Sequence, residues 1–131
     1  MNILLIDDDP LFSMLNKRMI RTIDKDAEFY TCENGADAIE YLKNCISENI
    51  KLPDIIFLDL NMPVIDGWEF LKEYDSLRAF VDNRVMIYVL SSSISPYDVS
   101  RAKEMVYVKD YLPKPVQMAT LEIVLGNANI C

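Results

Sequence analysis

The sequence predicts an α/β fold, a doubly wound sandwich in which helices cover both faces of a five-stranded parallel sheet. Short aliphatic runs that end in acidic or hydroxyl residues alternate along the chain with longer segments whose apolar residues recur every three or four positions. Strands separated by helices of this length imply right-handed βαβ crossovers, which place the strands in parallel between two helical layers. We therefore expect a (βα)5 arrangement.

The first, third and fourth aliphatic runs are expected to form strands buried on both faces, because they are too short for helices and almost wholly apolar. The second and fifth runs are weaker and are typical of edge strands. In chain order, the predicted strands cover residues 3–6, 28–32, 55–58, 85–90 and 108–112.

Helices are expected after each strand. Their apolar repeats are Leu11, Leu15, Met19 and Ile23, then Ile39, Leu42 and Ile46, then Val99, Ala102 and Val106, and finally Met118, Leu121 and Leu125. A further helix follows Gly67 and has no clear end. Asp9 before Pro10 marks one helix start, because it places a capping oxygen ahead of a proline in the first turn. Ser95 before Pro96 predicts another in the same way.

The composition predicts one soluble, acidic domain over residues 1–131, without an output domain. Thirteen Lys and Arg against twenty-one Asp and Glu give a net charge of −8, and without a basic stripe we expect no nucleic-acid binding. The chain has no apolar run long enough for a membrane span and no basic signal-peptide start, so we expect a cytoplasmic protein. Cys32 and Cys45 are expected to be buried, reduced thiols.

The absence of histidine excludes Ser-His-Asp catalysis and the HExxH zinc helix. The chain also has only three glycines, which are too scattered for a dinucleotide-binding fingerprint or a P-loop. Any proton or phosphoryl transfer must therefore use other side chains.

Polar residues follow four of the predicted strands, at the edge where an open α/β sheet binds its ligands. In strand order they are Asp7 and Asp8, then Asp59, then Ser91, then Lys114. Carboxylates this close repel one another without a cation, and hard oxygen ligands suit Mg²⁺. Asp59 could then attack phosphorus and form an acyl phosphate while Lys114 neutralises charge on the transferring oxygens. Ser91 would donate a hydrogen bond to the product phosphoryl group.

Each residue alone has an ordinary structural explanation. An acidic triplet after a strand is usually a solvated turn whose last member, here Asp9, caps the next helix. Asp59 alone is compatible with loop chemistry, and Tyr111 with a half-buried aromatic on an edge strand. Pro115 permits a cis bond that would turn the Lys114 side chain inward. The functional interpretation rests on the conjunction of independent features at the ends of four strands.

Together, the pair Asp7-Asp8 and the segments DLNMPVIDGWEFL (59–71), MIYVLS (86–91) and DYLPKPV (110–116) closely resemble the response regulator receiver domains of two-component signalling. The resemblance covers nearly the whole chain, including ENGADAIEYL (33–42). It implies a flavodoxin-like sheet of order 2-1-3-4-5. It also implies phosphorylation on Asp59 by a sensor histidine kinase or a histidine phosphotransfer protein, which would supply the imidazole that this chain lacks.

The resemblance further implies a Mg²⁺ (or Mn²⁺) site. The ion would be held by the carboxylates of Asp8 and Asp59, by Asp7 through water, and by the backbone carbonyl of Asn61. Such a phosphoacceptor is not an enzyme beyond its own phosphoryl transfer and slow autodephosphorylation.

Ser91 would be the switch hydroxyl, Tyr111 the switch aromatic, and Lys114 the lysine that reaches the phosphoryl group. A downstream target protein would bind the face formed by the fourth helix, fifth strand and fifth helix. The sequence departs from the common pattern in two places. Ser91 replaces the more frequent Thr, and Tyr107-Val108 replaces a small Gly-Ala pair, so this face is expected to have a different shape.

Two other classes remain open. A Mg²⁺-dependent aspartyl phosphatase of the haloacid dehalogenase type would use Asp7 as nucleophile and Asp9 as acid. The short chain, without a cap domain, and the position of Asp59 after the third strand argue against it. A degenerate receiver that serves only as a docking module is the second, although all the expected site residues are present. The sequence does not decide between a phosphoryl relay and an effector.

Overall fold

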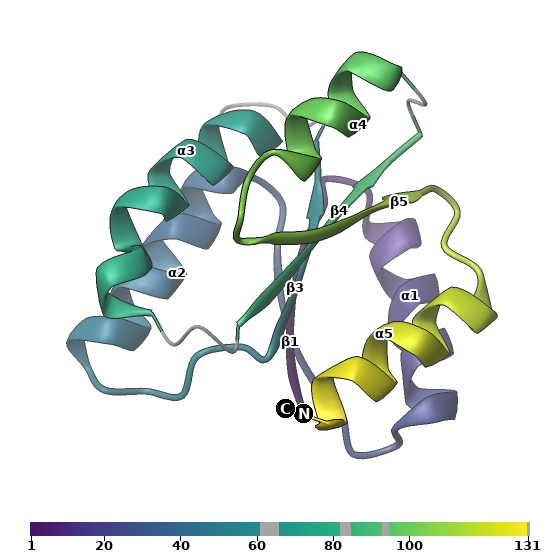
Figure 1. Ribbon diagram of the computed structural model, residues 1–131. Helices are drawn as coiled ribbons and strands as arrows, with labels where there is room; N and C mark the ends of the chain where they lie inside the picture. Colours follow the sequence, from purple (N-terminus) through teal and green to yellow (C-terminus); the bar gives the residue numbers. More distant parts are fainter. Residues whose placement is uncertain (61–65, 82–84, 93–94, 131) are drawn as a thin grey trace.

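The computed structural model describes residues 1–60, 66–81, 85–92 and 95–130, in which strands and helices alternate (Figure 1). The strands are β1 (Asn2–Ile6), β2 (Glu28–Cys32), β3 (Ile55–Asp59), β4 (Met86–Ser91) and β5 (Val108–Pro113). The helices are α1 (Pro10–Ile23), α2 (Gly35–Ser47), α3 (Gly67–Leu77), α4 (Pro96–Lys103) and α5 (Met118–Ile130), with a short 3-10 helix η1 (Arg78–Phe80) after α3.

The strands form one parallel sheet in the order β2-β1-β3-β4-β5. This confirms the predicted fold class, the order 2-1-3-4-5 and the edge positions of β2 and β5. Each strand boundary lies within one residue of its predicted place. The bounds of β3 and β4 could be predicted closely because both strands are buried along their whole length, which makes their sequences almost continuously apolar.

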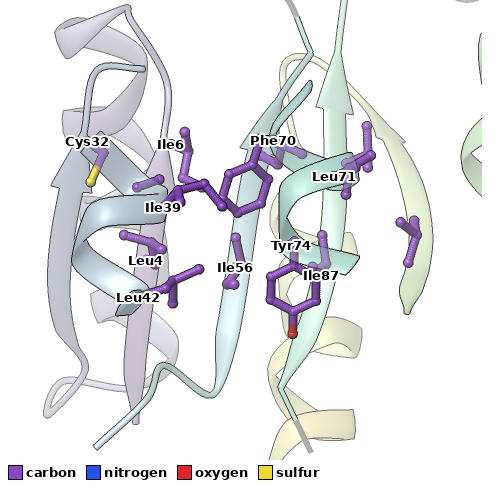
Figure 2. Packing of buried hydrophobic residues seen from close by; sticks show 14 of the residues in the cluster. Leu4, Ile6, Cys32, Ile39, Leu42, Ile56, Phe70, Leu71, Tyr74 and Ile87 are labelled. Carbon is purple, nitrogen blue, oxygen red and sulfur yellow. The ribbon is translucent and has the colours of Figure 1, made fainter. Parts of the chain in front are cut away.

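Helices cover both faces of the sheet (Figure 1). One apolar cluster lies between the sheet and the helices on each face. Successive strand residues point to opposite faces, so Leu4 and Ile6 enter one cluster while Ile3 and Leu5 enter the other. Figure 2 shows the first cluster, in which side chains of α2 and α3 pack on the strands. The labelled residues are Leu4, Ile6, Cys32, Ile39, Leu42, Ile56, Phe70, Leu71, Tyr74 and Ile87. The second cluster lies beneath α1 and α5.

Helix α1 begins where predicted, but only the second half of its predicted apolar stripe packs against the core. Asp9 caps it, since its Oδ1 accepts hydrogen bonds from the backbone N–H groups of Leu11 at 3.0 Å and Phe12 at 3.4 Å. Leu11 and Leu15 of the four-residue repeat are exposed, whereas Met19 and Ile23 pack against the second cluster. The buried residues of the helix are instead Ser13, Asn16 and Ile20. Ser13 and Asn16 line the same small cavity as Asp7, near the carboxyl edge of the sheet.

Helix α4 is shorter than its apolar repeat indicates. It begins at Pro96 as expected, but the Ser95 side chain makes no capping hydrogen bond, so that part of the prediction is wrong. Val106 lies beyond the helix and is 82% exposed. The chain has to leave the helix there to enter β5, and the Val108 backbone N–H donates to the Met105 carbonyl at 3.1 Å in this turn.

Cys32 and Cys45 are buried and free of disulfides, as expected. Burial raises the pKa of the Cys32 thiol to about 12, and the charge of Asp37 adds to the shift. Among the described residues, no helix combines the length and apolar character that crossing a membrane requires.

Candidate functional site

Three carboxylates meet at the carboxyl edge of the sheet. Strands β1 and β3 are neighbours, with Ile6 opposite Leu58, so the residues that follow emerge side by side. One ligand oxygen from each of Asp7, Asp8 and Asp59 lies within 4.8 Å of the others. Asp7 and Asp59 are buried, whereas Asp8 is exposed. The prediction that the ends of neighbouring strands bring these acids together is therefore met.

Backbone contacts fix the orientation of Asp7. Its N–H donates to the Cys32 carbonyl at 3.0 Å, which continues the pairing of β1 with β2 by one residue. Its Oδ1 accepts a hydrogen bond from the Asp9 N–H at 2.8 Å. Its Oδ2 is buried and forms an ion pair with Nζ of Lys114 at 2.8 Å. No other described residue donates a hydrogen bond to this oxygen.

Lys114 reaches the same edge from the segment after β5. Its Nζ is 2.8 Å from Asp7 Oδ2 and 3.3 Å from Asp59 Oδ2. Its backbone N–H donates to the Ser91 carbonyl at 3.0 Å, and its peptide bond to Pro115 is cis. Burial alone would lower the pKa of Lys114, but the contact with Asp7 and the charge of Asp59 outweigh it and raise the pKa. Lys114 is therefore an ammonium ion that bridges two carboxylates.

Ser91 is the last residue of β4, opposite Pro113 of β5, and is fully buried. Tyr111 lies on β5 opposite Val89 and is half-buried, as expected for an edge strand. Ser91 therefore ends at the same edge of the sheet as Asp59. Asn61, for which a backbone carbonyl ligand was predicted, lies outside the described residues.

The residues at this edge fit a small divalent cation. Lys114 provides one positive charge within contact distance, whereas the cluster contains three carboxylates. The buried Asp7 Oδ2 has few partners to offset its desolvation. Carboxylate oxygens are hard ligands, which suit Mg²⁺ or Mn²⁺ better than softer metals.

Two contacts at the site, and a third at the opposite edge of the sheet, were not predicted from the sequence. The Phe12 ring lies against the Lys114 ammonium, with Nζ 4.3 Å from the ring centroid. Gly67, at the start of α3, packs against the end of β3. Tyr107 donates a hydrogen bond to the Leu71 carbonyl at 2.9 Å, so it ties the turn before β5 to α3. Of these three contacts, only that of Tyr107 had a sign in the sequence, because Tyr107 is a large residue where the common pattern has a small one.

The chain has a parallel sheet of this order, with an acidic cluster and a lysine at its carboxyl edge. These features are those of receiver domains. The family model described as "Response regulator receiver domain" matches residues 3–125. The chain belongs to the response regulator receiver family and is a receiver domain of a two-component response regulator.

Relatives of known structure and name agree with this assignment. A two-component response regulator from Cytophaga hutchinsonii superposes with a TM-score of 0.85 at 30% identity, over 99% of this chain and 97% of that one. Response regulator Rcp1 of Synechocystis is 33% identical over 113 residues, which is 86% of this chain and 75% of that protein. A crystal structure of the Mn²⁺-bound form of Rcp1 gives a TM-score of 0.70 at 30% identity, covering 95% of this chain and 89% of that one.

Similarity also extends to a much longer protein. The protein-glutamate methylesterase/protein-glutamine glutaminase of Clostridium acetobutylicum is 32% identical over 115 residues. The match covers 86% of this chain but 30% of that protein. What the two share is thus the receiver domain.

Proposed function

We propose that this receiver domain accepts a phosphoryl group on Asp59 in a reaction that depends on Mg²⁺. The observation that carries the proposal is the position of the Lys114 ammonium, which contacts both Asp7 and Asp59 within one acidic cluster. A lysine in this place can balance charge on a phosphoryl group as it arrives at Asp59.

The chemistry is a displacement at phosphorus. A carboxylate oxygen of Asp59 forms a bond to phosphorus while the bond to the donor's nitrogen or oxygen breaks, which leaves an acyl phosphate. The donor leaves as imidazole from a phosphohistidine, or as acetate from acetyl phosphate. Hydrolysis of the acyl phosphate by water would return Asp59 and release phosphate. The chain is therefore proposed to be a signalling phosphoacceptor and not an enzyme acting on other substrates.

Asp8 and Asp59 would hold the metal ion through their carboxylates, and Asp7 would hold it through water. The backbone carbonyl of Asn61 remains a predicted further ligand. A bound Mg²⁺ or Mn²⁺ ion supplies positive charge next to the transferring oxygens. Two observations support the proposal: the mutual approach of the three carboxylates and the Mn²⁺-bound form of the related Rcp1.

Phosphorylation is proposed to act as a switch through Ser91 and Tyr111. A phosphoryl group on Asp59 adds charge and acceptor oxygens, and the Ser91 hydroxyl would move to donate to it. The Tyr111 ring would then turn into the vacated space and change the face formed by α4, β5 and α5. Ser91 and Tyr111 lie on the adjacent strands β4 and β5, with Tyr111 opposite Val89, two residues before Ser91, which supports coupling between them.

The proposed partners are a sensor histidine kinase or histidine phosphotransfer protein as donor, and a target protein at the α4, β5 and α5 face. The donor's histidine is needed because this chain has none. Tyr107, in the turn between α4 and β5, packs toward α3, since its ring lies 5.5 Å from that of Tyr74 and its hydroxyl donates to the Leu71 carbonyl. A partner that reaches this turn would meet a larger side chain than the small residue of the common pattern.

Intact-mass measurement after incubation with acetyl phosphate tests the proposal. The wild type should gain one phosphoryl group with Mg²⁺ and none when the metal is chelated, and Asp59→Asn should gain none. Asp75→Asn is the matched control, because Asp75 is an exposed carboxylate on α3 whose partner is Arg78. Equal labelling of Asp59→Asn and the wild type would contradict the proposal.

A further inference from the structure

The Lys114 ammonium contacts an aromatic ring as well as two carboxylates. Its Nζ lies 4.3 Å from the centroid of Phe12, 2.8 Å from Asp7 Oδ2 and 3.3 Å from Asp59 Oδ2. A cation at this distance from a ring is attracted by the negative charge of the π face. The ring therefore acts on the same atom that the two carboxylates hold.

The position of Phe12 is determined by the start of α1. Asp9 caps the helix and accepts the Phe12 N–H, so the backbone of the first turn is anchored directly after the acidic cluster. The ring is partly buried and packs against the apolar cluster that includes Phe57 and Leu90. Phe12 thus has a fixed backbone on one side and a packed core on the other, which leaves its ring little freedom to move away from Lys114.

The ring also limits the access of water to the ammonium. The Lys114 side chain is 17% exposed although it ends in a charge. Contacts between charges are stronger where water is excluded, because the local dielectric constant is lower. With a smaller side chain at Phe12, water would surround the ammonium and weaken its hold on the carboxylates.

We propose that Phe12 is a positioning residue, whose ring keeps the Lys114 ammonium between Asp7 and Asp59 and so within reach of the phosphoryl group. The role rests on the proposed phosphorylation of Asp59. In that step, with acetyl phosphate as donor, a carboxylate oxygen of Asp59 forms a bond to phosphorus and the bond from phosphorus to the acetate oxygen breaks. Lys114 balances the charge on the transferring oxygens. Phe12 touches none of the reacting atoms and acts through Lys114.

Three variants separate the π face from simple packing. Phe12→Leu keeps apolar bulk and removes the ring, whereas Phe12→Tyr and Phe12→Trp keep an aromatic face. Leu11→Ala is the matched control, because Leu11 lies in the same helical turn and its side chain is exposed.

The first readout is NMR of the lysine side chains, which needs no phosphorylation. The methylene protons next to Nζ of Lys114, assigned with Lys114→Arg, should show a ring-current shift in the wild type. That shift should be lost in Phe12→Leu and kept in Phe12→Tyr and Phe12→Trp. An unshifted wild-type signal would overturn the contact itself.

The second readout is the rate of labelling by acetyl phosphate at saturating Mg²⁺. Phe12→Leu should be slower by about threefold to tenfold, as the loss of one partly desolvated cation–π contact implies. Phe12→Tyr, Phe12→Trp and Leu11→Ala should stay close to the wild type. An unchanged rate in Phe12→Leu, or equal slowing in all three Phe12 variants, would overturn the positioning role.

The two readouts also distinguish this inference from the proposed function. A wild type that shows the ring-current shift but takes no label would overturn phosphorylation on Asp59 and, with it, the role of Phe12 in that step. A wild type labelled on Asp59 at a rate insensitive to Phe12→Leu would overturn the role of Phe12 alone.

Discussion

Gly67 at the start of α3 lies directly against the end of the strand that carries Asp59. A Cβ atom at Gly67 would be 2.8 Å from the Asp59 carbonyl oxygen and 2.6 Å from Leu60 Cα. The Gly67 N–H also donates to the Leu60 carbonyl at 2.9 Å. Helix α3 can therefore begin this close to Asp59 only because residue 67 has no side chain.

Gly67→Ala is expected to destabilise the protein. The added methyl group would contact backbone atoms, which cannot turn aside as a flexible side chain can, so α3 would have to shift. Overpacking of this kind lowers the free energy of unfolding by about 1 to 3 kcal/mol. Urea denaturation followed by the fluorescence of Trp68, the single tryptophan, measures it.

Gly126→Ala is the matched control for Gly67→Ala. Gly126 lies in α5, and a Cβ atom there would meet nothing within 4 Å. Because alanine has the higher helix propensity, this variant should be as stable as the wild type or more stable by up to about 1 kcal/mol. Equal destabilisation by both substitutions would contradict the close-approach explanation.

Mg²⁺ is expected to raise the thermal stability of the wild type. A ligand that binds only the folded state adds about 2.7 kcal/mol when its concentration is 100 times its Kd. Asp8→Asn should remove most of this effect, since Asp8 is a proposed ligand, while Asp24→Asn at the end of α1 should retain it. Thermal unfolding with and without MgCl₂ measures the difference, and a full Mg²⁺ effect in Asp8→Asn would count against the metal site.

Ser91→Ala and Lys114→Ala are expected to leave phosphorylation of Asp59 possible but to weaken the switch. Without the Ser91 hydroxyl or the Lys114 ammonium, the phosphoryl group loses a contact that would draw the β4 and β5 ends toward it. Backbone NMR shifts in α4 and β5 on adding beryllofluoride and Mg²⁺ should be smaller than in the wild type. Ser92→Ala, at the exposed neighbouring residue, should respond normally. Undiminished shifts in both Ser91→Ala and Lys114→Ala would refute the coupling.

Tyr74 is expected to make the protein lose stability at alkaline pH. Burial raises the pKa of Tyr74 to about 12, and Arg78 offsets only part of the shift. Because the folded-state pKa lies above the unfolded value near 10, the protonated phenol contributes stability that is complete below about pH 10 and declines as the pH rises toward 12. The loss is on the order of 2 kcal/mol.

Urea denaturation between about pH 9 and pH 12 measures this loss, and Tyr74→Phe should show a shallower decline because it has no phenol to ionise. Tyr97→Phe is the control, since the Tyr97 side chain is 72% exposed. Parallel pH profiles for the wild type and Tyr74→Phe would show that Tyr74 does not cause the alkaline loss.

The strands and helix starts of this fold could be predicted because their signals are local. The run at residues 55–58 is apolar throughout and is buried on both sides, and Asp9 before Pro10 fixes the start of α1. The buried side of the first half of α1 could not be predicted in this way. Leu11 and Leu15 of the four-residue repeat are exposed, and the helix instead turns Ser13 and Asn16 inward, where they line the same small cavity as Asp7.

Much of the candidate site could also be anticipated, since Asp7, Asp8 and Asp59 end adjacent strands of a sheet whose order was implied. The contact between Phe12 and Lys114 could not be anticipated. It joins the first turn of α1 to the segment after β5, and residues so far apart in the chain have no spacing that would predict their contact. The expectation that residues 1–131 form a single domain with no output domain stays a prediction, as do the individual roles of the site residues.

The position of the phosphoryl group tests the central claim most directly. Wild-type protein treated with acetyl phosphate and Mg²⁺ would be reduced with borohydride, which converts an aspartyl phosphate to homoserine, and then digested and sequenced by mass spectrometry. We predict homoserine at position 59, dependent on Mg²⁺ and absent from Asp59→Asn. Homoserine at Asp7 with steady release of phosphate would contradict the account and indicate a phosphatase of the haloacid dehalogenase type instead.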